Sequence, residues 1–164
     1  MNKALNEEII AMLESDARLS AEDMAAMTGA DAEEIAAAVA KLEADKTIVK
    51  YTAIVNSDKV SGEDAEALIE VKVVPKRGLG YDDLADRIAK FDEVKSVYLM
   101  SGAYDLSVIV NAATMKQISK FVFEKLAVLE GVSSTVTHFI MRKYKEQGVV
   151  LTSHEPEERL VISP

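Results

Sequence analysis

The segment from Ser101 to Asp105 (SGAYD) is where residue types and spacing in this sequence come closest to forming a chemical site. It places a glycine, a phenol and a carboxylate between two predicted strands. Main-chain N–H groups exposed at Gly102 can donate to a ligand carboxylate, and the Asp105 carboxylate can bind an ammonium group. This chemistry fits an α-amino acid. Glycine and aspartate are also common turn residues, so an ordinary turn in which Asp105 bonds the main chain is the competing interpretation.

The sequence indicates no catalytic or metal-binding arrangement. It contains no Cys, and its two histidines, His138 and His154, lack the spacing of a zinc site or a catalytic triad. Ser101-Gly102 lacks the preceding glycine of a nucleophile elbow. Gly78-Leu79-Gly80 lacks the third glycine of a dinucleotide fingerprint and is interpreted as a flexible lead-in to a helix. We therefore expect no catalytic residue, no metal ligand and no cofactor.

The first 47 residues predict three short helices. Asn6 is the candidate N-cap of the first helix, Ser20 and Asp23 form a capping box for the second, and Asp31 caps the third. Apolar residues at helical spacing are expected to point inward: Ile9, Ile10, Leu13, Met24, Met27, Ile35, Val39 and Leu42. The turn Thr28-Gly29-Ala30 between the second and third helices is typical of a helix-turn-helix, although a generic three-helix cluster has the same spacing.

The rest of the chain predicts a second unit. Residues 48–55 (IVKYTAIV) predict a linking strand. Strand and helix patterns then follow in the order β-α-β-β-α-β, which is the ferredoxin-like motif of an α+β protein. The expected elements are strands at 67–74, 94–100, 104–110 and 132–144, and helices at 81–91 and 114–131. The predicted organisation is a helix-turn-helix domain at 1–47, a hinge at 48–62, a βαββαβ domain at 63–146 and a tail at 147–164.

Two of the predicted strands carry apolar residues on both faces. Leu106, Val108 and Val110 line one face of the strand at 104–110, whereas Ile109 points the other way. The strand at 94–100 adds Tyr98 to that second face. Because helices cover only one face of such a sheet, we expect a second copy of the chain to cover the other one. Scattered surface apolar residues are the alternative.

The formal net charge of −9 argues against a nucleic-acid binder at first sight. The charge is uneven, since residues 1–47 hold four basic and eleven acidic residues, a net of −7, and the remainder is close to neutral. No apolar run approaches the ~20 residues that span a bilayer. The first ten residues lack the layout of a signal peptide, so a cytoplasmic location without membrane contact is expected.

Three motifs carry a resemblance to a known family. Tyr51–Asn56 (YTAIVN) resembles a G-Y-x-A-hydrophobic segment, Val97–Asp105 (VYLMSGAYD) a hydrophobic-x-G-x-[FY]-D signature, and Leu129–Thr135 (LEGVSST) an L-x-G-V-x-x-T element. In this order, and after a helix-turn-helix, they resemble the Lrp/AsnC family of bacterial and archaeal transcription regulators. The resemblance covers nearly the whole chain.

The resemblance implies a helix-turn-helix joined to a ligand-sensing domain of the RAM type. Family members dimerise through their sheets, assemble into octamers or similar rings, and bind amino acids or related metabolites near the Gly-x-Tyr-Asp loop at contacts between dimers. The effector-binding residues carried over by the resemblance are Leu99, Ser101, Gly102, Tyr104, Asp105, Thr135, His138 and Phe139.

The third helix departs from the family pattern. The family carries several Arg or Lys residues there, whereas Lys41 is the single basic residue between Asp31 and Asp45. Each missing phosphate contact removes a counterion-release contribution from DNA affinity, although a glutamate can accept from cytosine in the major groove. The expected DNA-facing residues are Glu33, Glu34, Ala37, Lys41, Lys46 and Lys50.

The leading prediction is a regulator that binds double-stranded operator DNA. An amino acid or related metabolite, bound between subunits, would shift the assembly between arrangements with different DNA affinity. The alternative is a metabolite-binding oligomer whose helix-turn-helix no longer binds DNA. A third possibility, an enzyme on a ferredoxin-like scaffold, is disfavoured by the missing nucleophile and metal ligands.

Overall fold

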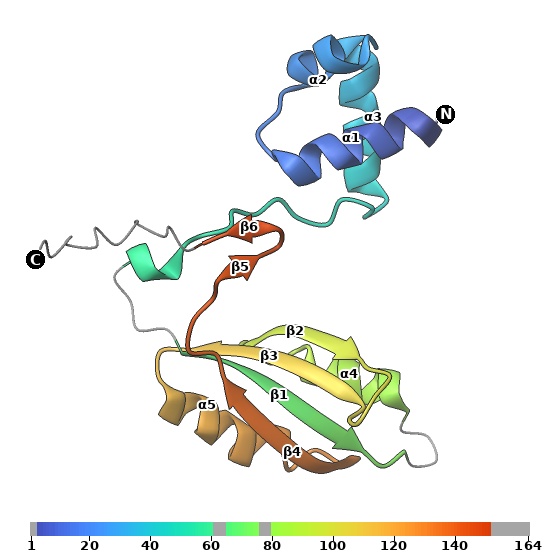
Figure 1. Cartoon of the computed structure of the whole chain (residues 1–164). Helices are drawn as coiled ribbons and strands as arrows, with labels where there is room; N and C mark the ends of the chain where they lie inside the picture. The colour runs from blue at the N-terminus through green and yellow to red at the C-terminus, as the bar shows by residue number, and fades with distance from the viewer. Residues whose placement is uncertain (1–2, 61–64, 76–79, 152–164) are drawn as a thin grey trace, which may run out of the picture. The chain divides into compact units, whose positions relative to one another are not determined.

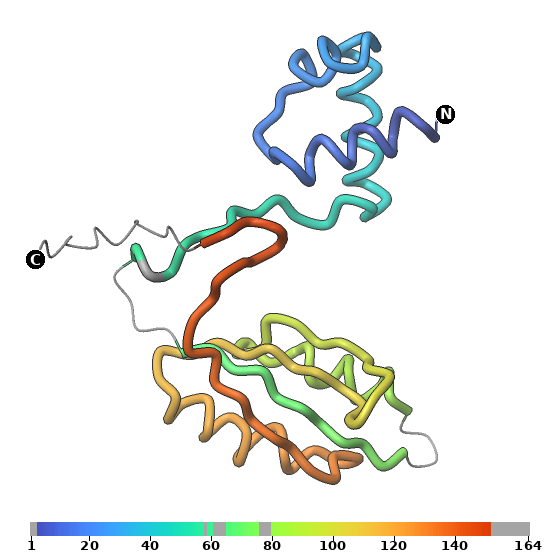
Figure 2. Tube along the Cα trace, viewed as in Figure 1, coloured from blue at the N-terminus to red at the C-terminus, as the bar shows by residue number. Residues whose placement is uncertain are grey.

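The computed structural model of the chain describes residues 3–60, 65–75 and 80–151. The chain divides into two compact units, Met1–Val55 and Asn56–Pro164, and each unit is described by itself (Figures 1 and 2). His154, the pair Gly78-Leu79 and most of the 147–164 tail lie outside the described residues. Within the described ranges, no helix is long and apolar enough to cross a bilayer.

The first unit consists of the predicted three helices. They are α1 (Lys3–Ser15), α2 (Ala21–Thr28) and α3 (Ala32–Ala44). Apolar residues from all three helices form one small core, and its buried members are Leu5, Ile9, Leu13, Met24, Ile35 and Leu42. Met27 is 65% exposed, so the prediction that it faces inward is wrong. In the short α2, Met24 is the buried residue, and Ala21 and Ala25 pack against the same core.

The helix ends follow their capping residues. The Ser20 hydroxyl accepts from the Asp23 N–H at 3.1 Å, and the Asp23 carboxylate accepts from the Ser20 N–H at 3.1 Å, which confirms the capping box. Gly29 ends α2 in the left-handed region at φ 73°. The Asp31 carboxylate accepts from the Glu33 N–H at 2.8 Å and caps α3. Asn6 lies inside α1 rather than at its N-cap, because the helix begins at Lys3, one turn earlier than predicted.

The second unit confirms the ferredoxin-like prediction. Its main elements are β1 (Ala65–Val73), α4 (Tyr81–Ile88), β2 (Val94–Leu99), β3 (Leu106–Ala112), α5 (Met115–Phe121) and β4 (Val132–Phe139). The sheet is antiparallel with the order β2-β3-β1-β4. Alternate residues of β1, namely Ala67, Ile69 and Val71, are fully buried and pack with Leu84 of α4 and Ile118 of α5. Both helices therefore cover the same face of the sheet (Figure 1).

Several boundaries differ from the predicted ones. No strand forms at 48–55 in the described structure, since an extended segment becomes a strand only where another supplies hydrogen bonds. β3 begins at Leu106 rather than 104, because Tyr104 and Asp105 belong to the preceding turn. β4 ends at Phe139, near the point where its partner β1 begins at Ala65. A short hairpin, β5 (Lys145–Glu146) and β6 (Val149–Val150), was not predicted.

The second predicted helix of this unit changes type within its length. α5 passes at Val122 into a π-helical turn, Val122–Leu126, closed by the Ala127 N–H donating to the Val122 carbonyl at 2.8 Å. A π turn contains one more residue than an α turn. The helical segment ends at Leu126, before the predicted Gly131.

Candidate functional site

The SGAYD turn joins β2 to β3 and is fixed to the sheet by main-chain bonds. The Met100 N–H donates to the Asp105 carbonyl at 2.8 Å, and the Asp105 N–H donates to the Val71 carbonyl at 3.0 Å. Ser101 and Gly102 are exposed, and Tyr104 is half-buried. A Cβ on Gly102 would meet no heavy atom within 4 Å. The turn therefore presents open main chain at the position where a ligand carboxylate was predicted to bind.

The Asp105 side chain bonds to the main chain of β1. Its Oδ2 accepts a hydrogen bond from the Val73 N–H at 2.8 Å, next to a register irregularity between Lys72 and Val73. The bond agrees with the competing interpretation from the sequence, an ordinary turn in which Asp105 bonds the main chain. The bond occupies one of about four acceptor positions of the carboxylate, and a ligand ammonium could bind the others.

The three predicted effector residues of β4 do not share one face of the sheet. Thr135 and Phe139 lie opposite Val71 and Ala67, two buried residues of the helix-covered face. His138 lies opposite Leu68 on the second face, where its Nε2 is 3.2 Å from Glu70 Oε1. Side chains alternate along a strand, which separates residues 135 and 139 from residue 138.

Within one chain, the SGAYD turn and the end of β4 do not converge. Asp105 directly precedes Leu106, which lies opposite Val71, whereas His138 lies opposite Leu68. The three positions between them on β1 correspond to about 10 Å along the strand. The turn precedes β3 and His138 belongs to β4, and these two strands flank β1 on opposite sides (Figure 1). The structure thus groups Leu99, Ser101, Gly102, Tyr104 and Asp105 around one turn and leaves His138 and Phe139 apart from them.

The second face of the sheet mixes apolar and polar residues. Two rows of directly opposed residues cross it: Tyr98, Ser107, Glu70 and Val136, and then Ser96, Ile109, Leu68 and His138. The apolar members stand at the two ends of the first row and in the middle of the second. Tyr98 and Val136 are exposed, at 55% and 50%. Four of the eight residues in these two rows are therefore apolar, as the two-faced strand pattern indicated.

The predicted DNA-facing residues are all exposed. Glu33, Ala37 and Lys41 follow one another at four-residue intervals along α3 and form one stripe, with Glu34 beside it. Lys46 and Lys50 follow the end of the helix, and Lys46 has a left-handed main chain at φ 65°. The stripe and Glu34 together carry two carboxylates and one ammonium group.

Comparisons with known proteins decide the family. The profile of the Lrp/AsnC ligand binding domain matches residues 66–150. A Bacillus subtilis (strain 168) protein named as the uncharacterized HTH-type transcriptional regulator YugG is 45% identical over 158 residues, which cover 96% of this chain and 95% of that protein. The chain belongs to the Lrp/AsnC family. Its curated relatives are transcriptional regulators rather than enzymes.

Solved structures of Lrp/AsnC proteins share the fold. AsnC of E. coli aligns over 89% of this chain and 96% of its own, with a TM-score of 0.68 and 18% identity. The transcriptional regulator NMB0573 of Neisseria meningitidis, solved as a complex with L-Met, aligns over 89% and 93% with a TM-score of 0.68 and 21% identity. At these identities the likeness concerns the fold, namely N-terminal helices followed by the four-stranded sheet with helices.

One feature of this Lrp/AsnC chain was not predicted from its sequence. A pocket lies beside α5, and its charged residues include Glu93 and Lys125. These two residues are 32 positions apart in the sequence. No periodic pattern or motif links them, so the sequence held no signal for this pocket.

Proposed function

We propose that the chain is a DNA-binding transcriptional regulator whose operator affinity changes when an amino acid or related metabolite binds at contacts between subunits. The exposed SGAYD turn carries this proposal. It offers open main chain at Gly102 beside the Asp105 carboxylate, a pair of groups suited to an ammonium and a carboxylate. The L-Met complex of NMB0573, a protein of the same fold, supports an amino acid as the ligand class.

The separation of the two residue groups supports a ligand site shared between chains. The turn supplies Ser101, Gly102 and Asp105, and the distant end of β4 supplies His138 and Phe139. A second copy that presents its β4 near the turn of the first would bring these groups together. Ligand binding would then favour one arrangement of subunits over another, which is the requirement for an effector to change DNA affinity.

The second face of the sheet supports a homodimer as the basic unit. Leu68, Ile109, Tyr98 and Val136 place apolar groups on a face that the two helices leave uncovered. A second copy of the same face would bury them. Association of such dimers into an octamer or similar ring would create the contacts at which the ligand binds.

The helix-turn-helix supports DNA as the partner of the first unit. The stripe Glu33, Ala37 and Lys41 lies on the exposed side of the second helix of the motif, where base edges are read in helix-turn-helix proteins. Lys46 and Lys50 supply further positive charge next to it. A ring that carries many copies would add avidity to a weak single contact.

Binding to the chain's own promoter DNA tests the proposal. Fluorescence anisotropy at about 50 mM salt, where phosphate contacts contribute most, should show saturable binding that at least one amino acid strengthens or weakens. A thermal-shift screen of all amino acids identifies the ligand first, because binding to the native state raises its stability. Ligand binding without any DNA binding would instead support a metabolite-binding oligomer whose helix-turn-helix no longer binds DNA. Absence of both would overturn the proposal.

A further inference from the structure

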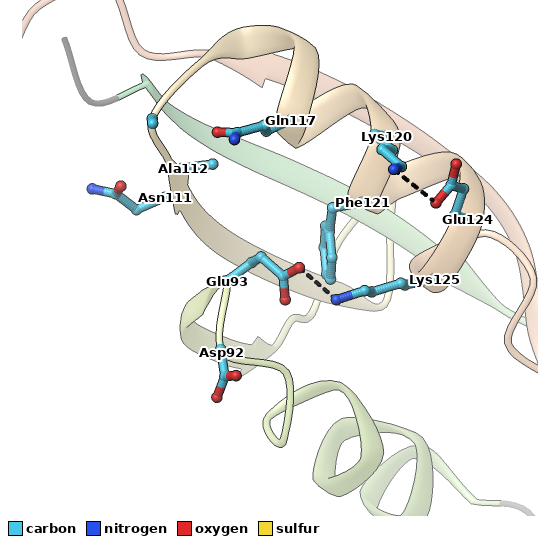
Figure 3. A pocket seen from close by; sticks show the side chains of 10 residues that line it. Asp92, Glu93, Asn111, Ala112, Gln117, Lys120, Phe121, Glu124 and Lys125 are labelled. Carbon is cyan, nitrogen blue, oxygen red and sulfur yellow. Dashed lines mark hydrogen bonds and ion pairs between the residues drawn. The ribbon is translucent and has the colours of Figure 1, made fainter.

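A pocket of about 500 Å³ lies at the far end of β3 from the SGAYD turn (Figure 3). Asn111 and Ala113 line it where β3 ends, Glu93 from the connection between α4 and β2, and Gln117 and Phe121 from α5. The turn precedes the first residue of β3, whereas the pocket begins at its last residues. Its volume falls within the range of small-molecule sites.

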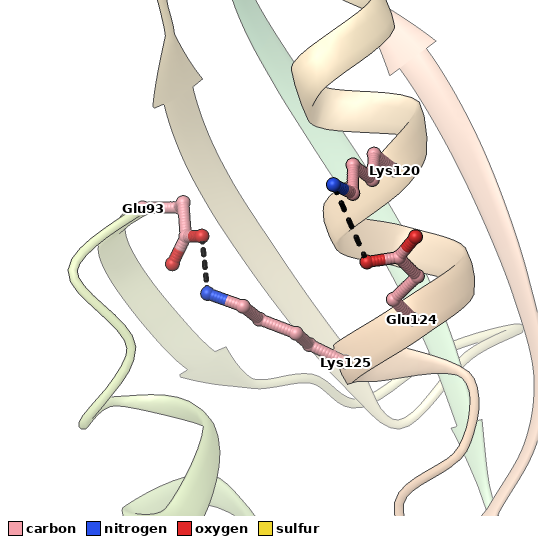
Figure 4. A network of polar contacts seen from close by, with 4 residues as sticks. All are labelled: Glu93, Lys120, Glu124 and Lys125. Carbon is pink, nitrogen blue, oxygen red and sulfur yellow. Dashed lines mark hydrogen bonds and ion pairs between the residues drawn. The ribbon is translucent and has the colours of Figure 1, made fainter.

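Charged groups in the pocket form two ion pairs (Figure 4). Lys125 Nζ lies 2.6 Å from Glu93 Oε1, and Lys120 Nζ lies 3.8 Å from Glu124 Oε2. The Lys125 ammonium is also 6.0 Å from the centre of the Phe121 ring. The hydrogen bond from Lys125 lowers the pKa of Glu93, against the smaller opposing effect of burial. Glu93 is therefore ionised, and its Oε2 remains outside the pair with Lys125.

The charge balance of the pocket favours a cationic ligand group. Asp92, Glu93 and Glu124 supply three carboxylates, whereas Lys120 and Lys125 supply two ammonium groups. One negative charge is therefore uncompensated among the lining residues. The Phe121 ring and the methyl groups of Ala112 and Ala113 provide apolar surface next to these charges, and the amides of Asn111 and Gln117 provide polar contacts.

The helix that lines the pocket contains the π turn at Val122–Leu126. Such turns are rare and occur frequently at functional sites, because the extra residue redirects the side chains around it. Glu124 and Lys125 belong to this turn, and both line the pocket. The irregularity of the helix and the pocket therefore coincide.

We propose that this pocket is a second small-molecule site, separate from the SGAYD turn, that binds a ligand with a primary ammonium group beside an apolar body. The ammonium binds Glu93 Oε2, and the apolar body lies against Phe121 and Ala113. An amine and an amino acid share this chemistry. Neither DNA binding nor a ligand at the turn is needed for it.

Three matched probes test the site on the full-length chain by calorimetry. Phenethylamine carries the ammonium alone, L-phenylalanine adds a carboxylate, and 3-phenylpropanoate lacks the ammonium. We expect saturable binding of phenethylamine, no binding of 3-phenylpropanoate, and slower hydrogen exchange at residues 111–126 in the complex. Equal binding of L-phenylalanine would indicate an amino acid as the ligand class, and weaker binding would indicate an amine. Absence of saturable phenethylamine binding would overturn the proposal.

Variants locate the bound probe. Ala113→Leu fills the pocket from an exposed position and should weaken phenethylamine binding at least tenfold, as should Glu93→Gln, which removes the charge but keeps an oxygen for Lys125. Ala127→Leu is the matched control. Ala127 is an exposed alanine directly after the π turn, and it does not line the pocket. Binding that survives both Ala113→Leu and Glu93→Gln would show that the probe binds elsewhere and would refute the site.

Discussion

Asp105 and Val73 are joined by a hydrogen bond from the Val73 N–H to the Asp105 Oδ2 at 2.8 Å. The bond lies beside the register irregularity of β1, and the Asp105 N–H also donates to Val71 at 3.0 Å. Asp105 thereby holds the β2–β3 turn against the central strand. The two interpretations of this residue from the sequence are compatible, because a side chain that shapes the turn also fixes the groups that the turn exposes.

Replacing Asp105 should reduce stability most when the new side chain cannot accept the hydrogen bond from the Val73 N–H. In Asp105→Ala, the Val73 N–H loses its partner, and the expected cost is about 1–3 kcal/mol in the free energy of unfolding. Asp105→Asn retains a carbonyl oxygen and should cost less. Urea unfolding followed by circular dichroism measures both variants. Wild-type stability in Asp105→Ala would contradict the structural role of this bond.

The same pair of variants tests Asp105 as a ligand contact. Asp105→Asn preserves the hydrogen bond but removes the charge that an ammonium group would meet. If the turn binds an amino acid, this variant should fold normally and bind the ligand at least about tenfold more weakly, which is about 1.4 kcal/mol. Unchanged amino-acid affinity by calorimetry would remove Asp105 from the ligand site.

The capping box of α2 should contribute measurably to the first unit. In Ser20→Ala the Asp23 N–H loses its side-chain acceptor, and loss of an N-cap costs about 0.5–2 kcal/mol. Ser15→Ala, at the exposed last residue of α1, is the control and should change stability little. Thermal unfolding of the two variants in parallel measures the difference. Equal melting temperatures would contradict the assignment of Ser20 as the cap.

Acid should weaken this cap through Asp23. The hydrogen bonds from the Ser20 side chain and main chain lower the pKa of Asp23, with a small opposing effect of burial. A carboxyl whose pKa is lower in the folded state contributes stability above its unfolded value, near pH 4, and loses it as the pH falls through the folded value. The stability difference between wild type and Ser20→Ala should therefore shrink below about pH 4. Melting curves between pH 3 and pH 7 test this, and a constant difference would argue against it.

Charge changes on the α3 stripe should move DNA affinity in opposite directions. Lys41→Ala removes a positive group and should weaken binding, with the slope of log K against log salt smaller by about one. Glu34→Gln removes a negative group from the same surface and should strengthen binding. Lys3→Ala on α1 makes the same charge change as Lys41→Ala away from the stripe. Anisotropy titrations at several salt concentrations distinguish the three, and equal effects of Lys3→Ala and Lys41→Ala would exclude the stripe as the DNA surface.

The order of helices and strands could be predicted from the sequence because local patterns determine it. The Ser20-x-x-Asp23 box and the alternation of Ala67, Ile69 and Val71 both act within a few residues. Residues 48–55 have an equally clear strand pattern, yet no partner in the described structure supplies hydrogen bonds, so local propensity was insufficient. The pocket was beyond prediction for a related reason, since Glu93 and Lys125 meet only after the sheet and α5 have packed.

The sequence correctly placed a turn between two strands at Ser101–Asp105, whereas the ligand site at this turn stays a prediction. Motif spacing places Gly102 and Asp105 together because they are close in the chain. The alternation of side chains along β4 puts Thr135 and His138 on opposite faces, whereas the distance of His138 from the turn depends on the register of β4 with β1. In the proposed site, a second chain would supply the residues at the end of β4, in line with the position between dimers that the family resemblance implies.

The second face of the sheet gives a direct test of the proposed dimer. Val136 is 50% exposed on this face and lies opposite Glu70, so Val136→Asp would place a second carboxylate beside an existing one in the proposed interface. We expect at least a tenfold weaker dimer, about 1.4 kcal/mol, by light scattering at micromolar concentrations. Phe123→Asp is the control, because Phe123 is 75% exposed on the π turn of the helix layer, away from this face. If wild type were monomeric, or if Phe123→Asp dissociated the dimer and Val136→Asp did not, the interface would have to lie on the helix side.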